Sequence, residues 1–280
     1  MQEQPTISQV QARLTRILKW FDAFCRENGL RYYALGGTCL GAVRHQGFIP
    51  WDDDVDVGMP RKDYERLAGL LREERDGFRL ETPDSPAPDY CYPISKLYDI
   101  RSVLIENKRV PVKRGLFLDV FPLDGAGESY EEALARQRGI KRGYDFYLTR
   151  VAALRKGRQL HKNLAVRVCR LIPRALVDDA ALRKKLDRKA KALDYEASAW
   201  TCNFFGAWGK REIVPRAVMG EPTERPFGEL RIFCPADSDA YLTALYGDWR
   251  QLPPEEKRVT HHEYLFLDLD HGYLDPPPSP

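Results

Sequence analysis

The chain has 280 residues, of which 43% are hydrophobic and 30% charged, and its formal net charge is +3 at pH 7. This balance is typical of a globular protein and excludes a largely disordered chain, while the small net charge argues against a nucleic-acid partner. No segment approaches the roughly 20 apolar residues that a membrane-spanning helix needs, and the first residues do not resemble a secretory signal.

The six cysteines are scattered, without a close pair and without histidines at zinc-ligand spacing. We therefore expect reduced cysteines in a cytoplasmic protein rather than a disulfide framework or a zinc site. They are Cys25, Cys39, Cys91, Cys169, Cys202 and Cys234.

The first 125 residues alternate between helical and extended patterns. Apolar residues recur at three- and four-residue steps from Ile7 to Phe24, which predicts an amphipathic helix that ends near Asn28-Gly29. The expected elements after it are a strand at 30–35, a short helix at 38–44, a loop at 47–50, a strand at 55–59, a helix at 61–75, a strand at 78–81, a loop at 82–93, a strand at 96–106, and a strand at 115–121 stopped by Pro122. We expect an α/β fold of the α+β type, with a mixed sheet core flanked by helices.

A basic, mostly helical region follows. Ser129 and Glu132 form a capping box that predicts the start of a long helix. Residues 136–191 contain 18 Lys and Arg against four acidic residues, a local net charge of +14 that favours anionic partners. We expect a catalytic core at 1–128, a helical basic region at 129–200 and a segment at 201–280 that packs back on the core.

The most informative stretch is the acidic run that enters the strand at 55–59. Side chains alternate along a strand, so Asp54 and Asp56 face one way and Val55 and Val57 face the core. Two carboxylates on one face repel each other unless a cation lies between them, and hard oxygen ligands suit Mg²⁺, with Mn²⁺ as the alternative ion. A solvated acidic loop is the usual explanation of such a cluster, but the apolar flanks make it less fitting here.

A third carboxylate interrupts another apolar strand. Asp119 lies in the stretch GLFLDVFP, and on a neighbouring strand it would complete a site for one or two ions. We also assign it the role of general base toward an acceptor hydroxyl.

Gly36, Gly37 and Thr38 lie between a predicted strand and a predicted helix. Glycines allow backbone N–H groups to approach a phosphate, and a helix N-terminus favours an anion. The alternative is an ordinary turn. Further candidates for phosphate contacts are Arg44, His45 and Lys96, each of which has an alternative as a surface side chain.

Two other patterns concern substrate and membrane. The aromatic residues considered for a cage around a quaternary ammonium group are Trp51, Tyr90, Tyr92, Tyr98, Tyr241, Tyr246 and Trp249, although aromatic residues are more often part of a core. Residues 150–172 combine apolar and basic positions at helical spacing, which is typical of a helix lying on an anionic inner leaflet. The alternative is a helix that packs its apolar face on the core, and this alternative is slightly favoured by the sequence.

Taken together, these motifs resemble the LicD family of phosphotransferases. The resembling blocks are LGGTCLGAVRHQGFIPWDDDVDVGMPRKDY at 35–64, SKLYD at 95–99, GLFLDVFPLDG at 115–125 and AYLTALYGDW at 240–249. Fukutin-type proteins share the carboxylate core, but some carry a cysteine-rich zinc loop that this chain lacks.

The resemblance implies a nucleotidyltransferase-like fold and transfer of phosphocholine from CDP-choline to a surface-glycan precursor, such as a lipopolysaccharide or a teichoic acid, that is lipid-linked in some cases. By position it implies donor-phosphate contacts at Gly36, Gly37 and Thr38, and metal ligands at Asp54, Asp56 and Asp119. Phosphoethanolamine, aminoethylphosphonate and polyol phosphates stay open as head groups.

Two other functions remain as alternatives. One is a nucleotidyltransferase that attacks the α-phosphorus of a nucleotide and releases pyrophosphate. The other is a catalytically silent protein that binds glycans or membranes, which the three intact aspartates argue against.

Overall fold

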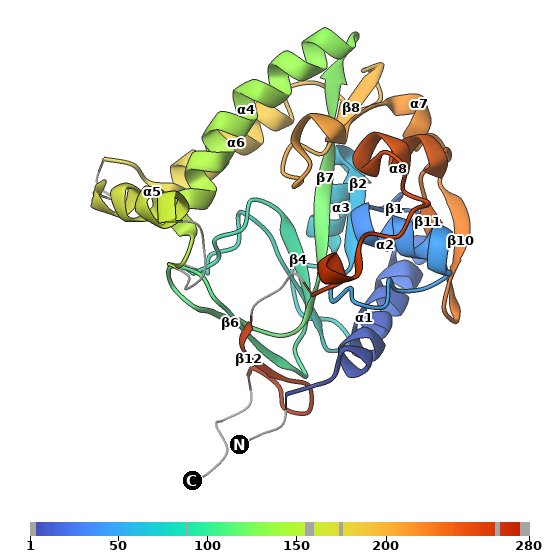
Figure 1. Ribbon diagram of the computed structural model, residues 1–280, viewed down its shortest axis with the longest axis horizontal. Helices are drawn as coiled ribbons and strands as arrows, with labels where there is room; N and C mark the ends of the chain where they lie inside the picture. Colours follow the sequence, from blue (N-terminus) through green and yellow to red (C-terminus); the bar gives the residue numbers. More distant parts are fainter. Residues whose placement is uncertain (1–3, 88, 155–159, 174–175, 261–263, 275–280) are drawn as a thin grey trace.

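The computed structural model describes residues 4–87, 89–154, 160–173, 176–260 and 264–274. A curled mixed sheet runs through the centre of the molecule, and helices pack around it (Figure 1). A basic helical region projects to one side, with α5 (Leu160–Leu171) at its far end. The expected α/β fold with a mixed sheet flanked by helices is confirmed.

The main sheet has the strand order β1-β2-β7-β4-β3. Its strands are β1 (Tyr33–Ala34), β2 (Asp56–Pro60), β7 (Phe117–Gly127), β4 (Ser95–Asp99) and β3 (Phe78–Glu81). The pair β2–β7 is parallel, whereas β1–β2, β7–β4 and β4–β3 are antiparallel. Beyond this path, β8 (Trp200–Cys202) pairs with the far half of β7 and β9 (Ile213–Pro215) pairs with β8. One long strand, β7, therefore joins the first half of the sequence to the second.

The predicted N-terminal helix is confirmed as α1 (Ile7–Glu27), capped by Asn28 at its C-terminus. Thr6 caps its N-terminus in a capping box with Gln9, and one apolar face is buried. This helix packs against β4 and β7. A second helix that packs on the main sheet is α3 (Arg61–Leu70), which lies against β2 and β7.

The prediction that Pro122 stops its strand is wrong, because β7 continues to Gly127. On one side of β7, β2 pairs through Pro122, which lies opposite Met59. On the other side, the pairing with β4 ends at Val120 and the pairing with β8 begins at Asp124. Pro122 therefore falls in a gap where no neighbour on that side needs the N–H that proline lacks.

Three other boundaries differ from the predictions. The strand expected at 96–106 is two strands, because the chain turns at 100–102 and β5 (Val103–Glu106) joins a separate sheet with β6 (Val112–Arg114) and β12 (Tyr264–Asp268). The helix expected at 61–75 ends at Leu70. The helix expected at 38–44 begins earlier, as α2 (Gly36–Leu40), and continues as a π-helical turn at Gly41–His45.

The helical region consists of α4 (Tyr130–Val151), α5 and α6 (Asp179–Ala190) within the described residues. Ser129 caps α4 as predicted. The fully buried Arg150 of α4 links the three helices, because its guanidinium donates to the carbonyls of Cys169, Ile172 and Val177 and pairs with Asp179.

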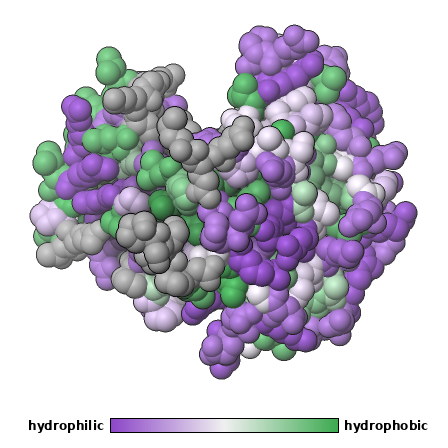
Figure 2. Space-filling view, turned by 90° about the horizontal axis from the view of Figure 1, so that it is seen from below, coloured by the Kyte–Doolittle hydropathy of each residue, from purple (hydrophilic) through white to green (hydrophobic). Residues whose placement is uncertain are grey.

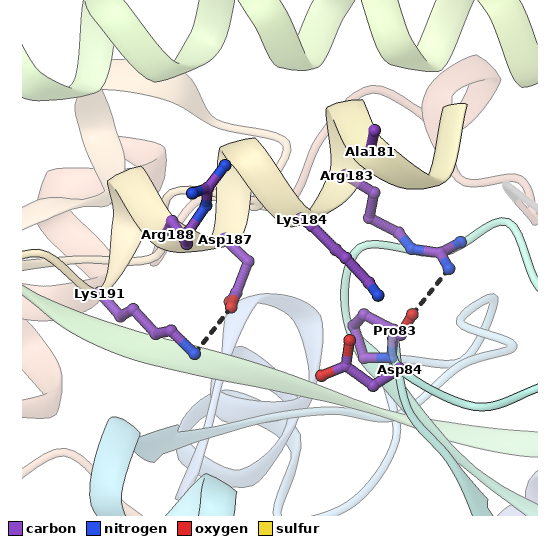
Figure 3. Close-up of a pocket in the computed structure, with 8 residues that line it drawn as sticks. All are labelled: Pro83, Asp84, Ala181, Arg183, Lys184, Asp187, Arg188 and Lys191. Atoms are coloured by element: carbon purple, nitrogen blue, oxygen red, sulfur yellow. Dashed lines mark hydrogen bonds and ion pairs between the residues drawn. The ribbon is translucent and has the colours of Figure 1, made fainter. Parts of the chain in front are cut away.

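Helix α6 is also fastened to the core. Arg183 donates to the carbonyl of Pro83 at 2.7 Å, and Lys191 pairs with Asp187 on the helix itself (Figure 3). Asp187 in turn accepts a hydrogen bond from Arg61 at 2.8 Å, so that α3 and α6 are tied together.

The later part of the chain packs on the core through short elements. They are η2 (Gly209–Glu212), α7 (Arg216–Met219), β10 (Thr223–Phe227), β11 (Leu230–Cys234), α8 (Ser238–Tyr246), η3 (Glu255–Lys257) and β12. The domain boundaries at 128 and 200 stay predictions. All six cysteines are free, and none of the described helices is long and apolar enough to cross a membrane.

A buried ion pair holds the first turn of α3 to the sheet. Nε and Nη2 of Arg61 each donate to a carboxylate oxygen of Asp124 at 2.7 Å, and the Asp124 side chain is fully buried. Removing one partner of such a pair is costly, because the other partner would remain as an uncompensated charge inside the protein.

We therefore expect Arg61→Met to lower the free energy of unfolding by about 3–5 kcal/mol, since Asp124 would remain buried without its partner. The neighbouring Lys62 pairs with Asp194 on the surface, so Lys62→Met is the matched control and should leave the stability near the wild-type value. Urea unfolding of the three proteins tests this. Equal stability of Arg61→Met and wild type would contradict it.

Candidate functional site

The parallel pairing of β2 with β7 brings two of the predicted carboxylates together. Asp56 and Asp119 lie opposite each other in the register of the two strands. The Asp119 N–H donates to the carbonyl of Val55 at 2.9 Å, which fixes this alignment. Residues aligned on neighbouring strands point to the same face about 4.8 Å apart. The two carboxylates therefore share one face at the same end of the strands, and Asp54 lies two residues before Asp56.

The glycine pair packs directly on these acids. A Cβ atom at Gly37 would lie 2.5 Å from Oδ2 of Asp52, and one at Gly36 would lie 3.7 Å from Oδ2 of Asp56. Gly36 also has a φ of +49°, a conformation that side chains rarely adopt. The glycines open the first turn of α2 instead of preceding it, so this position presents bare backbone to the carboxylates.

Thr38 supports the carboxylate strand from within. It is buried, and its hydroxyl accepts a hydrogen bond from the Asp56 N–H at 2.9 Å. The Leu35 N–H donates to the Asp56 carbonyl at 2.9 Å as well. The structure therefore places Thr38 beneath the site, where it fixes Asp56.

The acidic loop before β2 is held from two distant segments. Gln11 of α1 donates its side-chain amide to the carbonyls of Asp52 and Ile49, at 2.9 and 3.2 Å. The hydroxyl of Tyr264 in β12 donates to the Asp53 carboxylate at 3.3 Å. Asp53 therefore anchors the loop, whereas Asp52 faces the glycine pair.

The crowded charges change the acidity of both strand carboxylates. Burial raises the pKa of Asp56 well above its ordinary value, and the charges of Asp54, Asp119 and Asp52 raise it further. Burial also raises the pKa of Asp119, while the Lys96 ammonium opposes that shift. This concentration of negative charge is what a bound cation would relieve.

Lys96 of β4 is the positive charge in the site. Its Nζ lies 2.7 Å from Oδ1 of Asp119, and 3.3 and 4.4 Å from the ring centroids of Phe117 and Tyr92. Burial lowers the pKa of Lys96, but Asp119 and Glu106 outweigh burial, so the pKa is raised and the ammonium stays charged. The sequence placed Lys96 as a phosphate contact, and the structure places it against a carboxylate.

The donor set fits a hard divalent cation, because three aspartates supply oxygen ligands in a place where their charges repel. Within the described ranges, no group of three or more His, Cys, Asp or Glu side chains is arranged to hold a metal ion. In this arrangement the Asp119 carboxylate is paired with Lys96. Metal ligation by Asp54, Asp56 and Asp119 therefore stays a prediction.

Arg44 and His45 point elsewhere. Nη1 of Arg44 donates to the carbonyls of Trp249 and Gln251 at 2.6 and 3.3 Å, and its Nε lies 3.0 Å from Nε2 of His45. Burial lowers the pKa of His45, and the Arg44 charge lowers it further. Arg44 therefore holds the segment after α8, and His45 packs beside Arg44.

Four of the seven aromatic candidates have informative neighbours. Several rings already face a cation of the protein: Lys96 and Lys108 lie over Tyr92, Arg258 over Trp51 and Arg250 over Trp249. Tyr246 instead packs against Trp208, with ring centroids 4.8 Å apart.

The Tyr246 hydroxyl is 3.7 Å from the position of a Cβ at Gly36, and Trp208 is 41% exposed. This aromatic pair lies beside the glycines. The sequence did not single out Trp208, because an isolated tryptophan outside any periodic pattern carries no such signal.

Two of the surface pockets lie beside α6, outside the carboxylate cluster. One of about 390 Å³ lies between α6 and Pro83-Asp84 (Figure 3) and contains none of the predicted site residues. The other, of about 840 Å³, is lined by residues including Lys108, Tyr147 and Arg150. Its lining residue Lys108 lies over the Tyr92 ring, with Nζ 5.1 Å from the ring centroid, and Lys96 contacts the same ring at 4.4 Å.

Glu212 is a buried acid that the sequence did not reveal, since it lies in a short polar segment without periodicity. Its carboxylate accepts from the Trp208 N–H at 3.2 Å, and a Cβ at Gly206 would lie 2.1 Å from it. Burial raises the pKa of Glu212 to about 7. Its charge also raises the pKa values of Tyr241, whose hydroxyl accepts from the Gly36 N–H, and of Tyr246.

Part of the chain is similar to a known family, and most of it is similar to one relative. Residues 29–131 match the family model LicD/FKTN/FKRP, nucleotidyltransferase domain. The chain is 26% identical to the lipopolysaccharide cholinephosphotransferase LicD of Haemophilus influenzae over 261 residues, which cover 92% of this chain and 96% of that protein. It is also 54% identical to the human ribitol 5-phosphate transferase FKRP over 60 residues, or 19% of this chain and 12% of that protein.

These similarities support a phosphotransferase of the head-group-transferring kind. The matched model ends at residue 131, so it includes the glycine pair and all three predicted metal ligands and excludes the basic helical region.

The buried Glu212 predicts a pH dependence of stability. A carboxyl group with a raised pKa in the folded protein stabilises that protein while it is protonated, and this stability is lost as the pH rises from about 4.5 to about 7. Glu212→Gln stays neutral, so its free energy of unfolding should rise relative to wild type by about 3 kcal/mol across this window.

Urea unfolding at several pH values measures this difference. Glu229 has a side chain that is 70% exposed, and Glu229→Gln is the control for which the difference should stay flat. A flat difference for Glu212→Gln would show that the carboxyl group is not protonated in the folded protein.

Proposed function

Since residues 29–131 match the LicD/FKTN/FKRP nucleotidyltransferase model, we propose that the chain is a metal-dependent head-group transferase of this family. It moves phosphocholine or a related phosphorylated group from a CDP-linked donor to a hydroxyl of a cell-surface glycan precursor. The observation that carries this proposal is the in-register pair Asp56 and Asp119, with Asp56 beside the bare backbone of Gly36 at the start of α2. Anionic substrates and a cation would meet at this point.

The proposed ion is Mg²⁺ or Mn²⁺, held by Asp54, Asp56 and Asp119. When bound, it supplies charge neutralisation on the non-bridging phosphate oxygens during displacement at phosphorus. The same neutralisation relieves the repulsion that raises the pKa of Asp56.

The residues around the acids have separate tasks in this proposal. Gly36 and Gly37 let the donor diphosphate approach the backbone, because neither carries a side chain. Asp119 accepts the proton of the acceptor hydroxyl. A bond forms between the acceptor oxygen and the phosphorus, and the bond from that phosphorus to CMP breaks. Lys96 balances charge beside Asp119 throughout.

We place the acceptor on the side of the 840 Å³ pocket. Its volume lies in the range of small-molecule sites, and its lining residue Lys108 lies over the Tyr92 ring that Lys96 also contacts. The donor head group would then lie on the other side, near Tyr246 and Trp208. A quaternary ammonium group suits these aromatic faces.

A second function is favoured by one observation, the nucleotidyltransferase character of the matched family model. A nucleotidyltransferase attacks the α-phosphorus of a nucleoside triphosphate and releases pyrophosphate. The carboxylates serve both reactions, because each is an in-line displacement with charge gathering on phosphate oxygens. The products distinguish the two.

We expect purified protein with CDP-choline, Mg²⁺ and a glycan acceptor to release CMP, and chelation of the ion to stop the reaction. Asp56→Asn should lower kcat by at least about a hundredfold, since it removes a charge that acts on the transition state. Asp145→Asn on the surface of α4 is the control and should keep the wild-type rate. Pyrophosphate release from CTP would instead favour the nucleotidyltransferase, and unchanged turnover in Asp56→Asn would overturn the site.

Donor identity can be tested without an acceptor. A ligand that binds only the folded protein raises its stability, by about 2.7 kcal/mol at a hundred times its Kd. We expect CDP-linked donors with Mg²⁺ to raise Tm, and the donor that gives the largest shift identifies the head group. Gly37→Ala should abolish the shift, because its Cβ would collide with Asp52. An equal shift in Gly37→Ala would contradict a donor site at the glycine pair.

A further inference from the structure

Helix α5 exposes apolar side chains along one side. Leu160, Leu164, Val168 and Leu171 are 89%, 59%, 52% and 80% exposed, respectively. Their spacing of four, four and three residues places them in one stripe along the helix. A helix that packs on a core shows the opposite arrangement, with its apolar stripe buried.

The opposite side of α5 makes the contacts with the protein. Val166 is buried there, and Nη2 of Arg170 donates to the Ala152 carbonyl of the α4 end at 3.3 Å. Arg150 of α4 holds the carbonyls of Cys169 and Ile172 at 3.4 Å. The expectation that the apolar face packs on the core is therefore wrong. The side of α5 that carries Val166 packs against the protein, and the leucine stripe on the opposite side stays exposed to solvent.

The charge of α5 has one sign. The helix contains Lys162, Arg167 and Arg170 and has neither Asp nor Glu. Arg167 is exposed and falls next to the stripe on the helical surface, three residues after Leu164. Residues 155–159 of the membrane-contact prediction lie outside the described residues, but they add Arg155, Lys156 and Arg158 to the charge of this part of the sequence.

The length of α5 limits how it can meet a bilayer. Its 12 residues correspond to about 18 Å of helix, well short of the roughly 30 Å of a hydrocarbon core. It projects from the body of the molecule at the left of Figure 1. On the same side of Figure 2, apolar and hydrophilic side chains alternate over the surface. A helix of this kind lies in the plane of an interface.

We propose that α5 docks the protein on an anionic lipid surface, with the leucine stripe at the boundary between head groups and acyl chains and with Lys162 and Arg167 toward the head groups. A second copy of the chain is the less fitting occupant. Two copies of α5 facing each other would bring like charges together, whereas anionic lipids complement them. The proposal concerns binding alone and does not depend on the proposed transferase activity.

The test is co-sedimentation of the full chain with vesicles of phosphatidylcholine, with and without one third phosphatidylglycerol. We expect binding to the anionic vesicles that weakens with salt. The variant Leu164→Gln/Leu171→Gln should bind at least tenfold less. Both side chains are exposed, so the variant should fold, and circular dichroism verifies this.

The matched control is Leu70→Gln/Leu252→Gln, which replaces two exposed leucines elsewhere and should bind as wild type does. Arg167→Gln should weaken binding to anionic vesicles without affecting neutral ones. Equal binding of Leu164→Gln/Leu171→Gln and wild type would overturn the proposal, as would failure of wild type to bind anionic vesicles. A dimer in size-exclusion chromatography that only the α5 variant dissociates, with no change in vesicle binding, would assign the face to a second copy.

Discussion

The in-register parallel pairing of β2 with β7 is the constraint on which the candidate site depends. It places the Asp56 and Asp119 carboxylates side by side, and the neighbouring residues compensate for the resulting charge. Lys96 pairs with Asp119, Thr38 fixes the Asp56 backbone, and Gly37 leaves room for Asp52. Repulsion among the carboxylates lowers the stability of the protein without an ion. A bound cation removes this repulsion, and the free energy gained contributes to the affinity for the cation. The surrounding residues thus hold the carboxylates in place, while the carboxylates themselves still repel one another.

Local patterns predicted much of the fold. The periodicity of residues 7–24 and the helix-start signal at Ser129 each predicted the right element, and so did the strand expected at 78–81, because the information lies within a few residues. The errors arose where the end of an element depends on pairing with a strand that is distant in the sequence. Whether Pro122 ends a strand depends on where β4 and β8 stop, and the break after Asp99 reflects pairing of β5 with β12, more than 150 residues later.

The same distinction applies to the site. Asp54, Asp56 and Asp119 stand out because charge in an apolar strand is visible locally, and the glycine pair stands out by type. The contact of Lys96 with Asp119 required the register of β4, and Glu212 and Trp208 became visible only through packing. The outward stripe of α5 was predicted as a pattern, but its direction was not, because periodicity cannot tell which side of a helix the core will cover.

The anchoring of the acidic loop also concerns the order in which the chain is made. Residues 44–53 are held by partners that are synthesised much later: Gly228 donates to the Gln46 carbonyl, Arg44 donates to the Trp249 carbonyl, and Tyr264 donates to the Asp53 carboxylate. During translation β2 and β7 can pair long before these partners exist. A nascent chain would therefore hold its carboxylates on an incompletely fastened loop, and the site becomes rigid only when the late segments fold over it. Because the chain is synthesised from its N-terminus, the pairing of β2 with β7 can precede the fastening of the acidic loop.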